Sequence, residues 1–256
     1  IVHFENKHRH PWELARYKII KEHVHQLING LPNIRPCILD IGCGDAYLVH
    51  QLSKDFPQAD FIGVDINFTD DLLTKIRSNI STNNLQIFQS LEDIKLPDAT
   101  INSILLLDVI EHIEDEIGFL KSLEGYAYIS EKAPLLITVP AYQGLFAFHD
   151  VILEHYRRYT NNTLRSRLRT AGYTTSYERY FFFILIFPRI IQLILEKIKK
   201  PIINRASDLA NWKGGKALTI IIETILWMDY QIGGLFKILG LKLPGLSNLV
   251  ICHRSA

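Results

Sequence analysis

A glycine turn directly after a short apolar run gives the strongest indication of the fold: residues 38–46 read ILDIGCGDA. An apolar run bounded by turn residues is typical of a buried parallel strand. Gly42 and Gly44 allow a sharp turn and leave room for a ligand beside the main chain. Residues 46–52 have helical spacing, so such a ligand would face a helix N-terminus. The segment therefore predicts a strand–turn–helix unit that binds a ligand.

Strand-length apolar runs recur along the chain, and segments with helical spacing separate most of them. The expected strands are residues 38–41, 61–65, 86–88, 101–107, 135–139, 173–181 and 248–252. The expected helices are residues 10–29, 46–54, 70–80, 114–130 and 160–171. This alternation predicts a parallel sheet with covered faces. Ligands of such sheets bind at the carboxyl ends of the strands, where Asp65 and the glycine turn both fall.

These features resemble the class I S-adenosylmethionine (SAM)-dependent methyltransferases, whose motif is acid-x-Gly-x-Gly-x-Gly. Asp40, Gly42 and Gly44 match the motif, and Ala46 replaces its last glycine. A dinucleotide-binding turn is the alternative, but Tyr47 stands where that turn needs a small residue. The resemblance implies an α/β fold: a Rossmann-like class I methyltransferase sheet with helices on both faces.

The resemblance also implies an enzyme that holds SAM at the strand ends. Asp40 would face the amino group of SAM, and Asp65 would accept both ribose hydroxyls. The run DVIEH at residues 108–112 is similar to one that follows strand four in many methyltransferases acting on small molecules and lipids. Its first two residues would lie nearest the methionine part. The implied cofactor-binding residues are Asp40, Gly42, Cys43, Gly44, Asp65, Ile66, Ser90, Leu91, Asp108 and Val109.

The loop after the fifth expected strand is rich in groups that could handle an acceptor. A neutral imidazole can take a hydroxyl proton near pH 7, so His149 and His155 are the candidate catalytic residues. In the alternative interpretation, His149 only packs the loop. The run HPWELAR at residues 10–16 resembles the lead-in of bacterial methyltransferases encoded with glycan and lipid pathways, where this helix helps to close the site. The alternative is a core tryptophan with a surface arginine. The candidate acceptor-binding residues are Trp12, Arg16, His112, Tyr142, Arg157 and Arg158.

The same DVIEH run also contains possible metal ligands. Asp108, Glu111 and His112 are similar to a Glu-x-x-Glu-His metal set of some methyltransferases, and their oxygens and imidazole suit Mg²⁺ or Zn²⁺. The first acid is Asp instead of Glu, however, and the run is common in enzymes without a metal. The sequence-based expectation is therefore no metal.

The C-terminal part of the chain is basic and contains long apolar runs. Residues 1–150 hold 12 Lys and Arg against 21 Asp and Glu, whereas residues 151–256 hold 16 against 6. Residues 181–195 and 217–232 are apolar and have basic neighbours such as Lys197, Lys199 and Lys200, and Trp227 and Tyr230 suit a membrane interface. This pattern predicts peripheral membrane contact. A self-packed helical subdomain, a homodimer interface and a transmembrane hairpin are the alternatives.

Three segments are therefore expected: a SAM-binding core with its N-terminal helix (1–181), a hydrophobic helical insertion between strands six and seven (182–246), and the last core strand (247–256). The expected activity is O-methylation of a lipid, lipid-linked sugar or prenylated acceptor at a membrane surface. A soluble small-molecule methyltransferase with a lid or dimer insertion, and a non-catalytic membrane adaptor, are the alternatives.

Long apolar runs disfavour nucleic acid as a partner. Three cysteines without disulfide spacing and an N-terminus unlike a signal peptide predict a cytoplasmic protein, peripheral at the inner membrane face.

Overall fold

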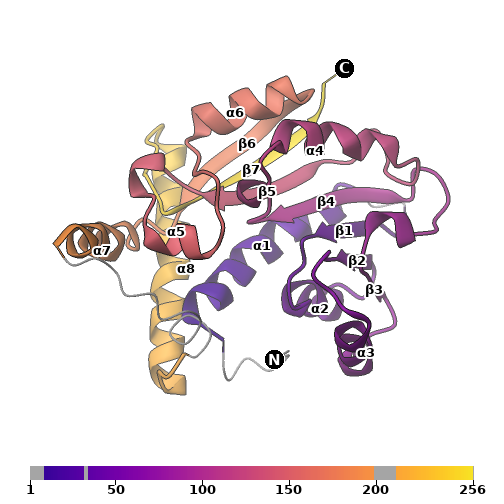
Figure 1. The fold of residues 1–256 in the computed structure, drawn as a ribbon, viewed down its shortest axis with the longest axis horizontal. Coiled ribbons are helices and arrows are strands. Elements are labelled where there is room, and N and C mark those ends of the chain that lie inside the picture. The colour runs from indigo at the N-terminus through magenta and orange to yellow at the C-terminus, as the bar shows by residue number, and fades with distance from the viewer. Residues whose placement is uncertain (1–8, 32–33, 199–211, 256) are drawn as a thin grey trace.

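The computed structural model describes residues 9–31, 34–198 and 212–255, and a seven-stranded sheet forms its centre (Figure 1). The strands are β1 (Cys37–Ile41), β2 (Asp60–Val64), β3 (Leu85–Phe88), β4 (Ile101–Leu107), β5 (Leu135–Pro140), β6 (Tyr173–Phe181) and β7 (Ser247–Arg254). Their order is β3-β2-β1-β4-β5-β7-β6, and only β7 runs antiparallel to its neighbours. The predicted Rossmann-like α/β sheet is confirmed.

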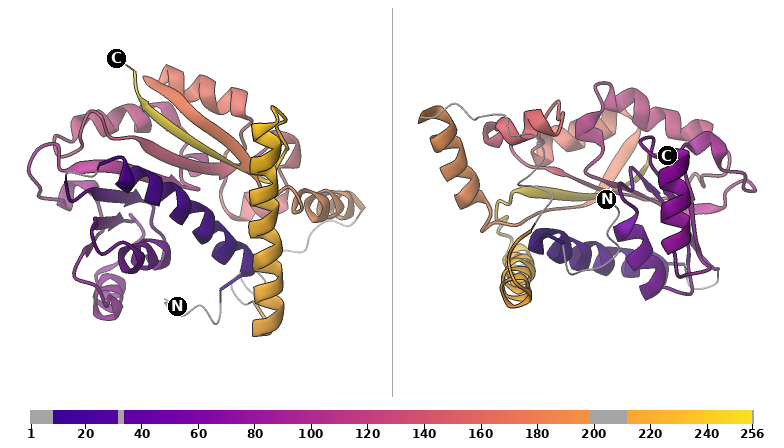
Figure 2. Two further views of the ribbon diagram at one scale, coloured as in Figure 1. Left: turned by 180° about the vertical axis from the view of Figure 1, so that it is seen from behind. Right: turned by 60° about the horizontal axis from the view of Figure 1, so that its bottom comes forward.

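Helices cover both faces of the sheet, as predicted (Figure 2). The helices are α1 (Pro11–Asn29), α2 (Tyr47–Asp55), α3 (Asp70–Asn79), α4 (Glu116–Ser122), α5 (Phe148–Ile152), α6 (Asn161–Thr170), α7 (Ile186–Ile198) and α8 (Lys216–Ile238). One core cluster joins α1, α2, α3 and α8 through residues such as Ile19, Val49 and Leu226. The other joins α4 and α6 through Leu120 and Leu164. The helices of each of these two clusters supply apolar side chains from one side, which is why the sheet is buried on both faces.

The register of the central strands places the functional edge. Ile41, the last residue of β1, pairs with Val64 of β2 on one side and with Leu106 of β4 on the other. The carboxyl ends of these three strands therefore lie side by side. The glycine turn, Asp65 and the residues after β4 emerge at this common edge, where ligands of open α/β sheets bind.

The expected helix at residues 114–130 is shorter in the structure. Asp115 caps α4 by accepting a hydrogen bond from the Gly118 N–H at 2.9 Å, and the helix ends at Ser122. Residues 127–130 instead run beside the start of β4, because the Ile101 N–H donates to Tyr128 and the Ser130 N–H donates to Ile101. A backbone committed to this extended pairing cannot also make helical hydrogen bonds.

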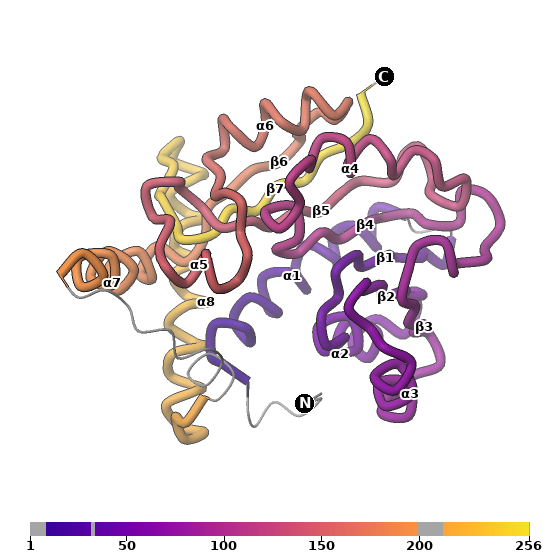
Figure 3. The backbone as a smooth tube through the Cα atoms, viewed as in Figure 1, coloured from indigo at the N-terminus to yellow at the C-terminus, as the bar shows by residue number. Residues whose placement is uncertain are grey.

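The insertion between β6 and β7 consists of α7 and α8 in the part that is described. Figure 3 shows the chain leaving the sheet after β6 and re-entering it as β7, which pairs antiparallel with β6. Both helices lie at the end of the molecule away from α3 (Figures 1 and 2). The predicted basic flank at Lys199 and Lys200 lies outside the described residues. No helix in the described part of the chain is long and apolar enough to cross a bilayer.

The face that α8 turns to the protein was predicted wrongly. Tyr230, expected at a membrane interface, is 4% exposed, and its hydroxyl lies 2.8 Å from His23 Nε2 of α1. The Trp227 indole N–H donates to Glu22 of α1 at 3.2 Å, so this side chain is also turned inward. Apolar residues surround most of α8, so the sequence pattern alone could not show which side packs on α1.

Candidate functional site

Hydrogen bonds tie the glycine turn after β1 to the end of β2. The N–H groups of Gly42 and Cys43 donate to the Val64 carbonyl at 2.8 and 3.0 Å. The Gly44 N–H donates to Asp65 Oδ2 at 2.8 Å. Gly42 has φ +74° and Gly44 φ +60°, in the left-handed region that favours glycine. The positive φ angles of the two glycines therefore shape the turn, and the carboxylate that follows β2 fixes it by a hydrogen bond.

The two glycines of the turn are expected to differ in their tolerance of a methyl group. A Cβ on Gly42 would lie 2.7 Å from Val109 Cγ2, whereas a Cβ on Gly44 would have no atom within 4 Å. Gly42→Ala should lose about 1–2 kcal/mol for its positive φ plus about 1–3 kcal/mol for the clash, and Gly44→Ala only the first amount. Denaturant unfolding of both variants measures the difference. Equal losses would contradict the assigned contact with Val109.

A cavity of about 250 Å³ opens in front of this turn. It brings together five of the predicted cofactor residues and two of the predicted acceptor residues. Its lining includes Asp40, Gly42, Cys43, Gly44 and Asp108, and also Trp12 and Arg16 from α1. The N-terminal helix is thus a wall of the predicted cofactor cavity, and the predicted acceptor contacts Trp12 and Arg16 face the same space.

Three polar side chains are linked near the ends of β4 and β5, and two of them, Arg16 and Asp108, line the cavity. Arg16 Nη1 lies 2.9 Å from Asp108 Oδ2, and Arg16 Nη2 donates to Thr138 Oγ1 at 3.0 Å. The Thr138 hydroxyl in turn donates to Asp108 Oδ1 at 3.0 Å. Asp108 has φ +58°, a backbone conformation that is uncommon outside glycine. Arg16 therefore joins α1 to both strands through Asp108 and Thr138.

Asp40 is a buried acid at the end of β1. Burial raises its pKa to about 7, although the nearby Arg16 guanidinium opposes the shift. Its Oδ1 has no hydrogen-bond partner among the described residues. A cationic ligand group in the cavity would favour the ionised form of this carboxyl, which fits the role predicted for Asp40 beside the amino group of SAM.

The remaining predicted cofactor residues lie outside the cavity lining, at the ends of β2, β3 and β4. Asp65 accepts hydrogen bonds from Gly44 and from the Asn67 N–H, the latter at 2.9 Å. Ile66 is 81% exposed, which leaves an apolar surface open at this edge. Ser90 and Leu91 form the turn after β3, and Val109 packs against Gly42. Their roles toward an adenine ring stay predictions.

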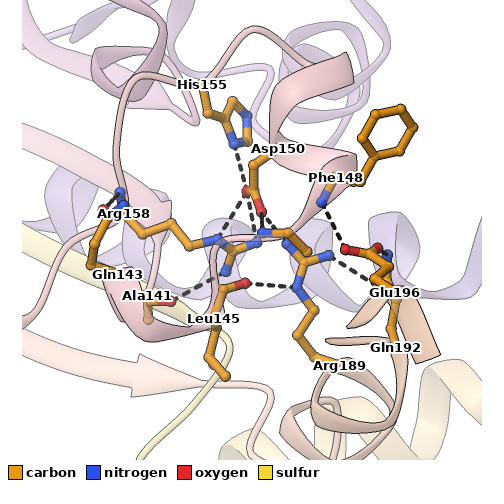
Figure 4. Close-up of polar contacts among 11 residues, drawn as sticks. Ala141, Gln143, Leu145, Phe148, Asp150, His155, Arg158, Arg189, Gln192 and Glu196 are labelled. Carbon is orange, nitrogen blue, oxygen red and sulfur yellow. Dashed lines mark hydrogen bonds and ion pairs between the residues drawn. The ribbon is translucent and has the colours of Figure 1, made fainter. Parts of the chain in front are cut away.

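A buried carboxylate organises the loop after β5 (Figure 4). Asp150 is fully buried and accepts hydrogen bonds from His155 Nδ1 at 2.9 Å and from Arg158 Nε at 2.9 Å. Arg189 of α7 also pairs with Asp150, and the Ala147 N–H donates to it at 2.8 Å. Burial alone would raise the pKa of Asp150, but the hydrogen bonds from His155 and Arg158 outweigh burial and lower it.

His155 also lies beside two residues of the DVIEH run. The His112 and His155 ring centroids are 4.6 Å apart, and Glu111 offers a carboxylate within 4.8 Å of both imidazoles. Burial, and next the charge of Asp108, raise the pKa of Glu111 well above its ordinary value. Burial lowers the pKa of His112. These three residues are the group in the described part of the chain that could hold a metal ion.

The other predicted acceptor-side residues are held by the protein itself. Arg157 pairs with Glu116 and donates to the Glu114 carbonyl, and Arg158 is 7% exposed on Asp150. The predicted anion clamp at these two arginines would have to break these pairs. Tyr142 stacks on Tyr180, with centroids 4.9 Å apart. Burial, together with the charge of Arg189, lowers the pKa of His149.

Several residues of the site could not be inferred from local sequence patterns. Arg9, Tyr47 and Leu48 line the cavity, and Arg9 pairs with Asp45 and lies 4.1 Å over the Tyr47 ring. Thr138 is a buried polar residue inside an otherwise apolar strand, and that irregularity in β5 was the one signal available. The links of Glu111 and Arg189 to this region depend on contacts between segments far apart in the chain.

A family model described as a methyltransferase domain matches residues 12–177. The match begins at the start of α1 and ends within β6, so it covers the glycine turn, Asp65, the DVIEH run and the Asp150 loop. The helices α7 and α8 lie beyond it.

Solved structures share the fold at low sequence identity. A methyltransferase from Galdieria sulphuraria whose proposed substrates are sarcosine and dimethylglycine is 12% identical, with a TM-score of 0.55 over 94% of this chain and 86% of that one. A SAM-dependent methyltransferase from Mesorhizobium loti is 11% identical, with a TM-score of 0.51 over 90% and 96%. A proposed methyltransferase from Haloferax volcanii, solved with its Trm112 activator, is 14% identical, with a TM-score of 0.51 over 95% and 94%. No curated protein sequence matches the chain.

Proposed function

Because this chain belongs to the class I SAM-dependent methyltransferases, we propose that it methylates an oxygen of a lipid-like acceptor while docked on a membrane surface. SAM is the cofactor and the chain is an enzyme. Methyl transfer breaks the bond between the sulfonium and its methyl group and forms an O–CH₃ bond, and the hydroxyl proton of the acceptor passes to a base or to water. The products are S-adenosylhomocysteine and the methylated acceptor.

The exposed apolar faces of α7 and α8 carry this proposal. On α8, a stripe of large apolar side chains is between 44% and 74% exposed: Leu218, Ile221, Ile225, Met228, Ile232, Leu235 and Leu239. On α7, a second stripe is between 41% and 72% exposed: Phe187, Ile190, Ile191, Ile194, Leu195 and Ile198. Soluble monomers rarely expose patches of this extent, and helices of this kind lie in the bilayer interface. Lys197, Lys213 and Lys216 are exposed near the helix ends, where they would meet anionic headgroups.

Contacts from α7 reach the candidate acceptor loop, which supports an acceptor that arrives from the membrane. Buried Arg189 pairs with Asp150, the residue that holds His155 (Figure 4). Glu196 accepts a hydrogen bond from the Phe148 N–H at 3.0 Å. The helix with an exposed apolar stripe is thus bonded directly to the loop that carries the predicted acceptor groups. By this proposal the enzyme works at the cytoplasmic face of a membrane.

A soluble methyltransferase that dimerises through α8 is the second candidate function. The residues of the α8 stripe recur at spacings of three and four, from Leu218 to Leu239 at the C-cap of the helix. This is the period at which two helices pack as a coiled coil. A small-molecule acceptor would then reach the site without a membrane.

Liposome co-sedimentation at several protein concentrations separates these two candidates. We expect the full chain to bind vesicles of phosphatidylcholine and phosphatidylglycerol, and Ile191→Glu combined with Ile225→Glu to bind at least about tenfold more weakly, because each buried Ile contributes about 1.5–3 kcal/mol. Ile34→Glu, a substitution of an equally exposed Ile (51%) elsewhere, should bind like the wild type. No vesicle binding, together with a dimer that the double substitution dissociates, would favour the soluble candidate.

Incubation with SAM labelled on its methyl group tests the acceptor class. The probe is a total polar-lipid extract dispersed in detergent, and label in the organic phase is the expected result. A variant unable to bind SAM, such as Asp65→Ala, is the negative control. Transfer only to water-soluble small molecules, with none to lipid, would overturn the lipid acceptor and leave the methyltransferase activity standing.

A further inference from the structure

A buried carboxylate lies beside two imidazoles and lacks a partner. Glu111 is 0% exposed, and neither of its oxygens accepts a hydrogen bond from another residue in the described part of the chain. Ligand atoms of Glu111, His112 and His155 all lie within 4.8 Å of one another. An ionised carboxylate buried without a partner is strongly unfavourable, so Glu111 holds a proton unless a cation binds among these three side chains.

A hydrogen bond to a buried acid orients one of the two imidazoles. His155 Nδ1 bonds to Asp150 Oδ1 at 2.9 Å, which leaves Nε2 as its second nitrogen (Figure 4). The His112 ring lies against the His155 ring, with centroids 4.6 Å apart. A carboxylate behind an imidazole is a usual support of a metal-binding histidine, because it holds the ring and its tautomer.

The nearby acid Asp108 is not part of this group. Its two carboxylate oxygens already interact with Arg16 and Thr138 at 2.9 and 3.0 Å. The sequence offered Asp108, Glu111 and His112 as the only visible donors, and no metal was expected. The folded chain replaces Asp108 by His155, a residue from a different loop.

We propose that Glu111, His112 and His155 bind one divalent first-row transition-metal ion, with Zn²⁺ as the reference ion. Two imidazoles and one carboxylate suit Zn²⁺, Co²⁺ or Fe²⁺ better than Mg²⁺, which prefers oxygen ligands. Three protein ligands also leave a coordination position open for an oxygen atom. This assigns His155 as a ligand instead of the predicted proton acceptor.

The role of the ion in transfer rests on the proposed function, whereas its binding does not. An acceptor hydroxyl on the open position would lose its proton to water more easily, because the ion stabilises the alkoxide. The alkoxide oxygen would then form the O–CH₃ bond as the S–CH₃ bond of SAM breaks. The electron pair of the broken bond stays on sulfur.

Metal binding by the full, untagged chain tests the proposal after treatment with a chelator. We expect calorimetry to show one high-affinity Zn²⁺ per chain, weaker Mg²⁺ binding, and visible absorption bands on addition of Co²⁺. Glu111→Gln and His155→Ala should each weaken Zn²⁺ binding by more than about 100-fold, and Asp150→Asn by about 10–100-fold through the loss of ligand support. His149→Ala removes an imidazole of the same loop and should leave the affinity unchanged.

Circular dichroism and S-adenosylhomocysteine binding show whether each variant is folded. The proposal is overturned if folded wild type binds no stoichiometric Zn²⁺, or if His149→Ala weakens binding as much as His155→Ala, since the chain has 10 histidines that could bind metal unspecifically. A chain that binds and uses SAM but takes no metal would defeat this inference alone. Failure of SAM binding would instead defeat the proposed function.

Discussion

Asp65→Ala should weaken SAM binding by about 100-fold or more if Asp65 accepts both ribose hydroxyls as predicted, because charged hydrogen bonds contribute about 1.5–3 kcal/mol each. Asp65 directly follows β2 at the functional edge, and its carboxylate fixes the glycine turn through Gly44 at 2.8 Å. The substitution therefore removes both the predicted ribose acceptor and a support of the turn. Calorimetric titration with SAM and with S-adenosylhomocysteine measures the effect.

Asp60→Ala is the matched control for this experiment. Asp60 begins the same strand, and its half-exposed side chain pairs with Arg35 at 2.9 Å on the surface. It should bind SAM like the wild type, because exposed pairs contribute about 0–1 kcal/mol to stability and this one lies far along β2 from the cavity. SAM binding by folded Asp65→Ala within threefold of wild type would contradict the predicted ribose contact.

Asp150→Asn should destabilise the fold by about 3–5 kcal/mol, the usual loss when one partner of a buried ion pair is removed. The carboxylate is fully buried between Arg158 and Arg189, and both guanidinium groups are themselves nearly buried. An amide at this position leaves two buried positive charges without a counter-charge. Denaturant unfolding at pH 7 measures the loss, and Asp98→Asn, which changes an exposed loop acid, should be close to neutral.

The difference in the free energy of unfolding between wild type and Asp150→Asn should depend on pH, which gives a second readout. The pKa of Asp150 is lowered in the folded chain, so its contribution to the free energy of unfolding is present above the ordinary aspartate pKa and is lost as pH falls toward the folded value. The gap between wild type and Asp150→Asn should therefore be constant from about pH 6 to 8 and shrink below about pH 4. A gap that grows at low pH would contradict an ionised Asp150.

The cofactor side of the site was largely predictable from local sequence patterns. A positive φ at Gly42 and Gly44, an acid near the end of β1, another directly after β2, and the polar break after β4 are each encoded within a few residues. Parallel strands then bring their carboxyl ends to one edge whatever the details of packing. That is why Asp40 and Asp108 were identified before the cavity that they line was known.

The acceptor side was predicted less well, because its groups come together through long-range contacts. The sequence predicts that Arg157 and Arg158 are free to bind an anion. In the structure, each is paired with a buried acid. In the sequence, Arg189 is a single charged residue within an apolar segment. In the structure, it links α7 to Asp150. The pairing of these charged groups depends on the path of the chain after α6 and β6. A local sequence pattern does not contain that information.

The sequence by itself determined the alternation of strands and helices, the glycine turn and its acids, because apolar spacing and backbone conformation are properties of neighbouring residues. It also determined that α7 and α8 are apolar, but not which side of α8 packs on α1. Only the tertiary structure decided that Tyr230 faces inward on His23, and that Glu111, His112 and His155 meet beside Asp108. Burial and charge pairing are shared between distant segments, so they exist only once the chain has folded.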